Sequence, residues 1–201
     1  EETMKKVLVG YITHSGTTRD VAEAIAEEIN KAGHQAEVLL LDQVKAIESY
    51  DAVVIGAPMI VGWHRDALKY LKTNKSALAS KPLALFLTGM SLTESPKPDA
   101  PEVDIHLDPK LVTPPQKPGR LTFKENFTTL GHYLNPILKL SPQSLKAIGV
   151  FGGRLDMYRL KWYEAIFVML IVGAKPGEKR NWPDIRAWAA GLPEKMGFSQ
   201  K

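Results

Sequence analysis

The segment at residues 7–32, VLVGYITHSGTTRDVAEAIAEEINKA, constrains the fold more than any other part of the chain. It opens with a continuous apolar run at residues 7–12, which is typical of a strand buried on both faces. Apolar residues then recur every four positions at Val21, Ile25 and Ile29, which predicts an amphipathic helix. A buried strand that leads into a helix through a short polar loop is the first unit of a parallel α/β fold.

The loop between this strand and helix is suited to binding a phosphate group. Its candidate ligands are consecutive: Thr13, His14, Ser15, Gly16, Thr17 and Thr18. Hydroxyl groups donate hydrogen bonds, and Gly16 allows the backbone to close around an anion. The first backbone N–H groups of the helix, at the positive end of its dipole, point into the same loop. The imidazole of His14 either adds partial positive charge or faces solvent, and an ordinary polar turn is the alternative interpretation of the loop.

Two common phosphate-binding motifs are absent from this loop, since it has neither the lysine of a P-loop nor a G-x-G-x-x-G sequence. The loop resembles that of the flavodoxins, which bind the terminal phosphate of flavin mononucleotide (FMN) with uncharged donors. The positions that match the flavodoxin signature are Tyr11, Thr13, Gly16, Thr18, Ala22 and Ile25. Gly10 departs from the signature, because a bulky apolar residue is usual there. The resemblance implies FMN as the cofactor.

Strands and helices alternate along the rest of the chain. Further strands are predicted at residues 36–41, 51–58, 82–87 and 145–151, and helices at residues 67–78, 123–134 and 182–192. Asn135-Pro136 is predicted to interrupt a helix, and Asn181 to cap the last one. These elements predict one flavodoxin-like α/β domain over residues 1–201, a doubly wound five-stranded parallel sheet in three α/β/α layers. In such a sheet the ligand lies where the loops after the first, third and fourth strands converge.

Two further loops are predicted to hold the flavin ring. The loop after the third strand comprises Pro58, Met59, Ile60, Val61, Gly62 and Trp63. Trp63 is predicted to stack on the ring and the backbone near Ile60 and Val61 to contact its N5 edge, although Trp63 capping the domain edge is the alternative. The loop after the fourth strand offers hydroxyl and backbone donors to the polar side of the ring, from Thr88, Gly89, Met90 and Ser91.

Two insertions, after the fourth and fifth strands, interrupt the alternation. Residues 89–120 hold seven of the fourteen prolines, which predicts a long loop that serves as a lid or is partly disordered. Residues 152–182 contain eight consecutive apolar residues at 165–172, and residues 154–180 carry six cationic side chains against three acidic ones. This composition is typical of a helix that lies on an anionic membrane surface. A helix buried against the sheet, or in the interface of an oligomer, is the alternative.

The amino-acid composition further limits the kinds of site and reaction that this chain can support. The chain has no cysteine, which excludes thiolate metal sites and iron–sulfur clusters, so redox chemistry requires a bound cofactor. The histidines show no metal-ligand spacing, Ser91 lacks the glycine of a nucleophile elbow, and nucleic-acid motifs are missing; no metal site or catalytic residue is predicted. A net charge of +4 favours anionic lipid or an acidic protein as partner. Without an apolar run long enough to span a bilayer, or a signal peptide, a cytoplasmic domain is expected.

A closer resemblance appears near the end of the chain. It rests on the motif Gly152-Gly153-Arg154-Leu155, on Tyr158, Arg159, Lys161, Trp162 and Tyr163 before the apolar run, and on Trp182. These motifs are similar to those of the menaquinone-dependent protoporphyrinogen oxidases, over residues 5–87 and 147–192 but not over residues 89–120. The resemblance implies an FMN-dependent enzyme that oxidises an organic substrate and passes electrons to a quinone at the inner membrane face. The alternative is a non-catalytic electron carrier between redox protein partners.

Overall fold

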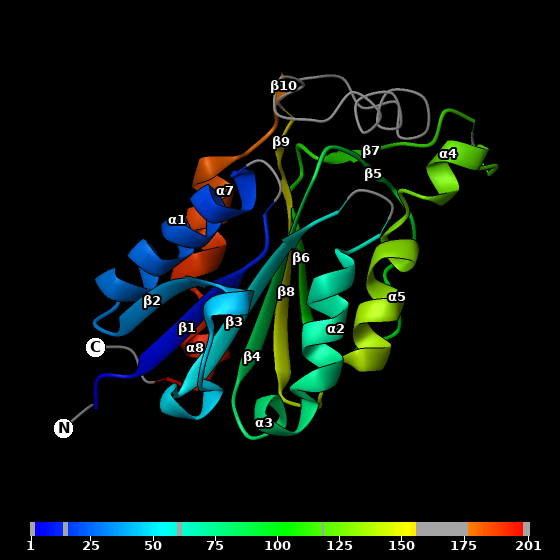
Figure 1. Ribbon diagram of the computed structural model, residues 1–201. Helices are drawn as coiled ribbons and strands as arrows, with labels where there is room; N and C mark the ends of the chain where they lie inside the picture. The colour runs from blue at the N-terminus through cyan, green and yellow to red at the C-terminus, as the bar shows by residue number, and fades with distance from the viewer. Residues whose placement is uncertain (1–2, 14–15, 60–61, 118, 156–176, 199–201) are drawn as a thin grey trace.

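The computed structural model describes residues 3–13, 16–59, 62–117, 119–155 and 177–198, and its centre is a twisted parallel sheet (Figure 1). The sheet has six strands in the order β2-β1-β3-β4-β8-β6. They are β1 (Lys6–Tyr11), β2 (Gln35–Leu40), β3 (Ala52–Pro58), β4 (Leu83–Gly89), β6 (Asp104–Leu107) and β8 (Leu145–Gly152). Every neighbouring pair in this order is parallel, which confirms the predicted doubly wound α/β class.

Helices cover both faces of the sheet and give three layers (Figure 1). One face carries α1 (Thr17–Lys31), α7 (Trp182–Ala190) and α8 (Leu192–Lys195), and the other carries α2 (Arg65–Thr73), α3 (Lys75–Ala79) and α5 (Leu130–Leu140). The short elements are η1 (Leu41–Gln43), η2 (Ile47–Ser49), α4 (Phe123–Asn126), β5 (Leu92–Thr93) paired with β7 (Val112–Thr113), and β9 (Arg154–Leu155) paired with β10 (Gly177–Glu178). Within the described residues, no helix is long and apolar enough to cross a membrane.

Two hydrophobic cores lie on opposite faces of the sheet and explain the unbroken apolar runs of its strands. Val7 and Val9 of β1 pack in the core beneath α1 and α7, whereas Leu8 packs in the core beneath α2 and α5. All three side chains are fully buried. Successive side chains of a strand point to opposite faces, so a strand covered on both sides needs apolar residues at every position.

The sixth strand, β6, corrects the predicted count of five. It comes from the proline-rich segment at residues 89–120, which was expected to be a loop and which also supplies β5 and β7. The stretch between Pro101 and Pro109 is free of proline, and Ile105 within it is buried. β6 pairs with β8 and stands at the edge of the sheet, where one side of a strand needs no partner.

The predicted helix at residues 123–134 is two helices, α4 and α5, and the predicted side-chain cap of α7 is absent although α7 starts at residue 182 as expected. α5 continues through Pro136 and begins after Thr129, whose side chain accepts a hydrogen bond from the His132 N–H at 3.2 Å. The cap at Thr129 marks the start of α5, and Pro136 does not interrupt the helix, contrary to the prediction. Asn181 precedes α7, but its side chain is turned toward Asp108, with Nδ2 donating to Oδ1 at 3.0 Å.

Candidate functional site

The predicted phosphate loop lies between β1 and α1 at the carboxyl edge of the sheet (Figure 1). Gly16 stands directly before α1 with a left-handed backbone, φ 87°. Its N–H donates to Thr13 Oγ1 at 2.8 Å, so the Thr13 hydroxyl keeps its own hydrogen for another acceptor. The first N–H groups of α1 have no partner within the helix. His14 and Ser15 fall outside the described residues.

A buried pair of hydroxyl groups joins this loop to the end of β4. Thr18 Oγ1 lies 3.1 Å from Thr88 Oγ1, and the two residues are 1% and 2% exposed. Whichever hydroxyl accepts this bond keeps its own hydrogen for a further acceptor. The Thr17 hydroxyl donates to the Arg154 carbonyl at 3.0 Å, which joins the start of α1 to β9.

The Thr18–Thr88 pair predicts a strong energetic coupling. Thr88→Val is expected to lower the free energy of unfolding by about 1–3 kcal/mol, because the buried Thr18 hydroxyl loses its partner. Thr18→Val should have a similar effect. The double variant should cost much less than the sum of the two, since neither hydroxyl then remains unpaired. Urea unfolding of the four proteins measures this coupling, and additive single-variant effects would contradict a direct bond.

The loops after β3, β4 and β8 are joined through their backbones. The Met59 N–H donates to the Thr88 carbonyl at 2.8 Å, and the Gly153 N–H donates to the Gly89 carbonyl at 2.6 Å. A Cβ atom at Gly89 would lie 2.7 Å from the Met59 side chain, so a larger residue there would displace Met59. The ends of β1, β3 and β4 therefore meet at one edge of the sheet, where Thr13, Pro58, Met59, Thr88 and Gly89 lie, with Met90 and Ser91 half-buried just beyond β4.

Trp63 was predicted to stack on the flavin ring, but its side chain is buried in the protein core. Its side chain packs in the core beneath α2, is 4% exposed, and donates from the indole N–H to the Ala57 carbonyl at 3.2 Å. Stacking on a flavin would require the indole to leave this packing, so that role stays a prediction. Gly62 has φ 122° and open space around it, and Ile60 and Val61 fall outside the described residues.

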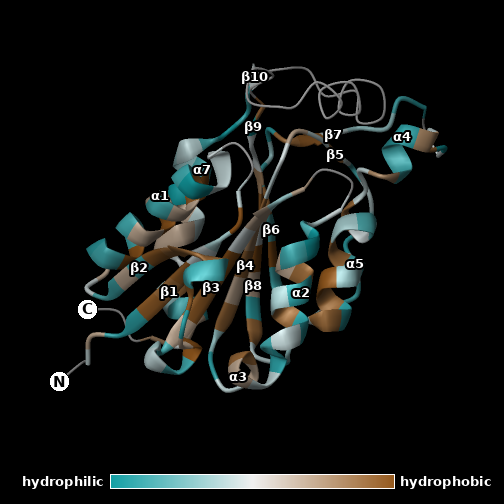
Figure 2. Cartoon of the chain, viewed as in Figure 1, coloured by the Kyte–Doolittle hydropathy of each residue, from teal (hydrophilic) through white to brown (hydrophobic). Residues whose placement is uncertain are grey.

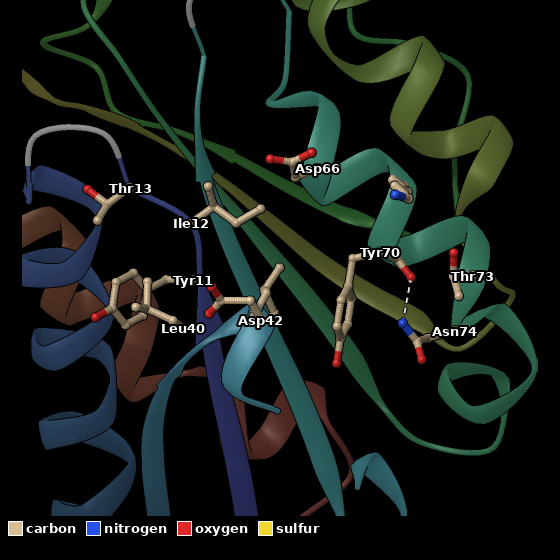
Figure 3. Close-up of a pocket in the computed structure, with 11 residues that line it drawn as sticks. Tyr11, Ile12, Thr13, Leu40, Asp42, Asp66, Tyr70, Thr73 and Asn74 are labelled. Carbon is tan, nitrogen blue, oxygen red and sulfur yellow. Dashed lines mark hydrogen bonds between the residues drawn. The ribbon is translucent and has the colours of Figure 1, made fainter. Parts of the chain in front are cut away.

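A pocket of about 580 Å³ lies beside the phosphate loop, between the ends of β1 and β2 and the helix α2 (Figure 3). Thr13 stands at one end of it, and burial raises the pKa of the lining residue Tyr70 to about 12. Its charged lining residues are Asp42, Asp66 and Lys69. Two carboxylates against one ammonium group disfavour an anion, so the pocket does not compete with the start of α1 for a phosphate.

Asp108 is a residue of this edge that the sequence analysis missed. It follows β6, is fully buried, and accepts hydrogen bonds from Asn181 Nδ2 at 3.0 Å, the Lys110 N–H at 2.9 Å and the Gly152 N–H at 3.4 Å. A buried carboxylate is stable only when such donors replace water. Asp108 therefore fastens the ends of β6 and β8 to the segment that precedes α7.

An ion-pair network ties the β9–β10 pair to the first turn of α1. Arg180 Nη1 lies 2.6 Å from Asp20, and Arg180 also pairs with Glu178. The hydrogen bonds from Arg180 hold the pKa of Glu178 below its usual range. Together with the bond from Thr17 to Arg154, these contacts fix the β9–β10 pair against the start of α1. No group of acidic or histidine side chains suited to a metal ion occurs in the part of the chain that the structure describes.

Comparison with known proteins identifies the family to which this chain belongs. The family model described as "Flavodoxin domain" matches residues 8–181, so the chain belongs to the flavodoxin domain family. Among curated proteins it is 24% identical over 176 residues to the protoporphyrinogen IX dehydrogenase [quinone] of Escherichia coli K12, covering 86% of this chain and 82% of that protein. The predicted resemblance to flavodoxins is confirmed.

Two solved flavodoxin structures are similar to this chain. A short-chain flavodoxin associated with a bacterial microcompartment superimposes with a TM-score of 0.52 at 13% identity, covering 96% of this chain and 99% of that one. A flavodoxin from the domain Archaea has a TM-score of 0.49 at 12% identity, with the same coverage of both chains. The first of these supports the flavodoxin-like three-layer fold.

Proposed function

We propose that the chain binds FMN and works as an FMN-dependent oxidoreductase. The observation that carries the proposal is the contact between Thr18 and Thr88, which brings the loops after β1 and β4 together beside the open first turn of α1. The donors at this turn are hydroxyl and backbone N–H groups, which fit the terminal phosphate of FMN without a charged side chain. The left-handed Gly16 leaves room for the phosphate close to the backbone.

In this proposal the three loops divide the work of binding. The phosphate is held by residues 13–18, and the ring lies between residues 58–63 and residues 88–91. FMN, when bound, supplies reversible transfer of a hydride or of single electrons at its ring. The loops orient the cofactor and exclude water from one face of it. The bond from Met59 to Thr88 links the two ring-binding loops, and the bond from Gly153 to Gly89 ties the second of them to the end of β8.

For the reaction, we propose that protoporphyrinogen IX is oxidised in successive two-electron steps, each of which reduces one quinone to the quinol. Support comes from the Escherichia coli relative, whose name gives that substrate and acceptor. Anaerobic assays of the FMN-loaded protein with protoporphyrinogen IX and a soluble menaquinone analogue test it, and substrate-dependent quinone reduction is the expected result. If the folded, FMN-loaded protein failed to reduce the quinone when given protoporphyrinogen or a related tetrapyrrole, the proposed reaction would be contradicted.

Electron transfer between protein partners is the second candidate function. The flavodoxin domain match favours it, because it spans residues 8–181 and so covers most of the chain. A redox titration separates the two candidates: an enzyme that transfers hydride should be reduced in one two-electron step, whereas a one-electron carrier should pass through a half-reduced form over a broad range of potential.

A quinone acceptor implies contact with a membrane, and we propose peripheral attachment through residues 154–180. The sequence of this segment supports the proposal with six cationic and three acidic side chains around its apolar run, although residues 156–176 lie outside the described part of the structure. Binding to anionic vesicles should weaken as salt is added. Equal binding to anionic and neutral vesicles would contradict an electrostatic attachment.

A further inference from the structure

A group of basic and aromatic side chains lies on helix α4 and beside it, outside the residues of the proposed FMN site. We define this basic–aromatic patch as Lys117, Arg120, Phe123, Lys124 and Phe127. Phe123 is 74% exposed, and among the described residues only Met4, at 66%, is a comparably exposed large apolar side chain. The Phe123 and Phe127 rings meet edge to face with their centres 4.9 Å apart. Figure 2 shows hydrophilic and hydrophobic residues side by side on α4, which projects from the body of the domain.

Local hydrogen bonds order the backbone that carries this patch. The Arg120 N–H donates to the Lys117 carbonyl at 3.2 Å around Gly119, whose φ is 73°. Thr122 and Glu125 form a capping box at the start of α4. A surface that is already ordered loses little conformational entropy when it binds a partner.

The one acidic residue between Lys117 and Phe127 is Glu125, and its side chain is turned away from solvent. Glu125 is 8% exposed, and its carboxylate accepts from the Thr122 N–H and the Gln116 N–H, each at 2.7 Å. These backbone bonds hold the pKa of Glu125 below its usual range. The exposed charges of the patch are therefore the cations of Lys117, Arg120 and Lys124.

The patch is fastened to the edge of the sheet where the predicted FMN loops meet. Directly after α4, Thr128 lies with its Oγ1 2.7 Å from Thr93 Oγ1, and its carbonyl accepts from the Thr93 N–H at 2.8 Å. Thr93 belongs to β5, which follows residues 88–91 by one position. Figure 1 shows α4 and the β9–β10 pair at this same end of the molecule.

We propose that the basic–aromatic patch is a docking surface for an anionic lipid bilayer. Cations attract the negatively charged headgroups, while Phe123 enters the interface between headgroups and acyl chains. The projecting position of α4 suits a broad, flat surface, and bilayer contact there would turn the carboxyl edge of the sheet toward the membrane. The proposal deepens the proposed membrane attachment by adding a second contact surface, and it requires neither bound FMN nor turnover.

Flotation of the full chain with vesicles tests this surface, using phosphatidylcholine mixed with phosphatidylglycerol and phosphatidylcholine alone. The triple variant Lys117→Gln, Arg120→Gln, Lys124→Gln should lose up to about a hundredfold in affinity for the anionic vesicles, since one cation contributes roughly fivefold. The matched control is Lys72→Gln, Lys75→Gln, Lys139→Gln, which removes the same charge from exposed lysines at the opposite end of the sheet. The control should keep most of its binding.

A second pair of variants tests the aromatic part of the patch. Phe123→Ser should weaken binding to anionic vesicles by about tenfold, whereas Met4→Ser, at the other exposed apolar residue, should leave it unchanged. Equal losses in the patch and control variants would overturn the proposal, as would wild-type protein that fails to float with anionic vesicles at low salt. Flavin content and quinone reduction, measured on the same samples, report separately on the proposed function.

Discussion

Replacing Thr13 by aspartate is expected to weaken FMN binding by about a thousandfold while leaving the domain folded. The new carboxylate can still accept from the Gly16 N–H, which Thr13 Oγ1 now binds at 2.8 Å. It also places a negative charge where the phosphate is expected. Two like charges about 4 Å apart near a protein surface repel by roughly 4 kcal/mol, which corresponds to that loss of affinity. Fluorescence titration of the apoprotein with FMN measures the change.

Thr13→Asn is the matched control, because asparagine has the size of aspartate and can accept from Gly16 without a charge. It should lose at most about tenfold in FMN affinity. Circular dichroism and urea unfolding of both variants exclude a folding defect as the cause. Similar FMN affinity in the aspartate and asparagine variants would show that no phosphate lies next to residue 13.

The second large effect concerns stability rather than binding. Asp108→Ala is expected to lower the free energy of unfolding by about 3 kcal/mol, because three donors lose the carboxylate that satisfies them. These donors are Asn181 Nδ2 and the N–H groups of Lys110 and Gly152, the last with a long bond of 3.4 Å. For a chain of this size, the loss corresponds to a decrease of roughly 6–12 °C in the melting temperature.

Asp99→Ala serves as the control for Asp108, since Asp99 is an exposed aspartate in the same proline-rich segment. Its replacement should change stability by less than about 0.5 kcal/mol. Thermal and urea unfolding of both variants make the comparison. If the two alanine variants were equally stable, Asp108 would not fasten β6 and β8 to the start of α7.

The central fold could be predicted because its signals are local. The unbroken apolar run of β1 reports burial on both faces, and the spacing of Val21, Ile25 and Ile29 reports the buried side of α1. The edge strand β6 was missed because prolines dominate its surroundings and only four residues form it. Its stability comes from pairing with β8, which lies about forty residues further along the chain.

In the candidate site, too, the features set by local sequence could be predicted, whereas contacts between distant residues could not. The Gly16 turn follows from local backbone requirements, and the structure shows it with a positive φ. The contact of Thr18 with Thr88 joins residues 70 positions apart, and the buried carboxylate of Asp108 depends on Asn181, 73 positions away. The local sequence assigned Asn181 to a helix cap, because asparagine before a helix usually has that role. In the structure, the Asn181 side chain binds Asp108 and does not cap the helix.

The most direct test of FMN binding is the absorbance spectrum of the purified chain, followed by extraction and mass measurement of any chromophore. We expect a yellow protein, or an apoprotein that takes up FMN in a one-to-one ratio, and a released compound with the mass of flavin mononucleotide. A colourless protein that stays colourless after incubation with FMN, while remaining folded, would show that the chain does not bind FMN.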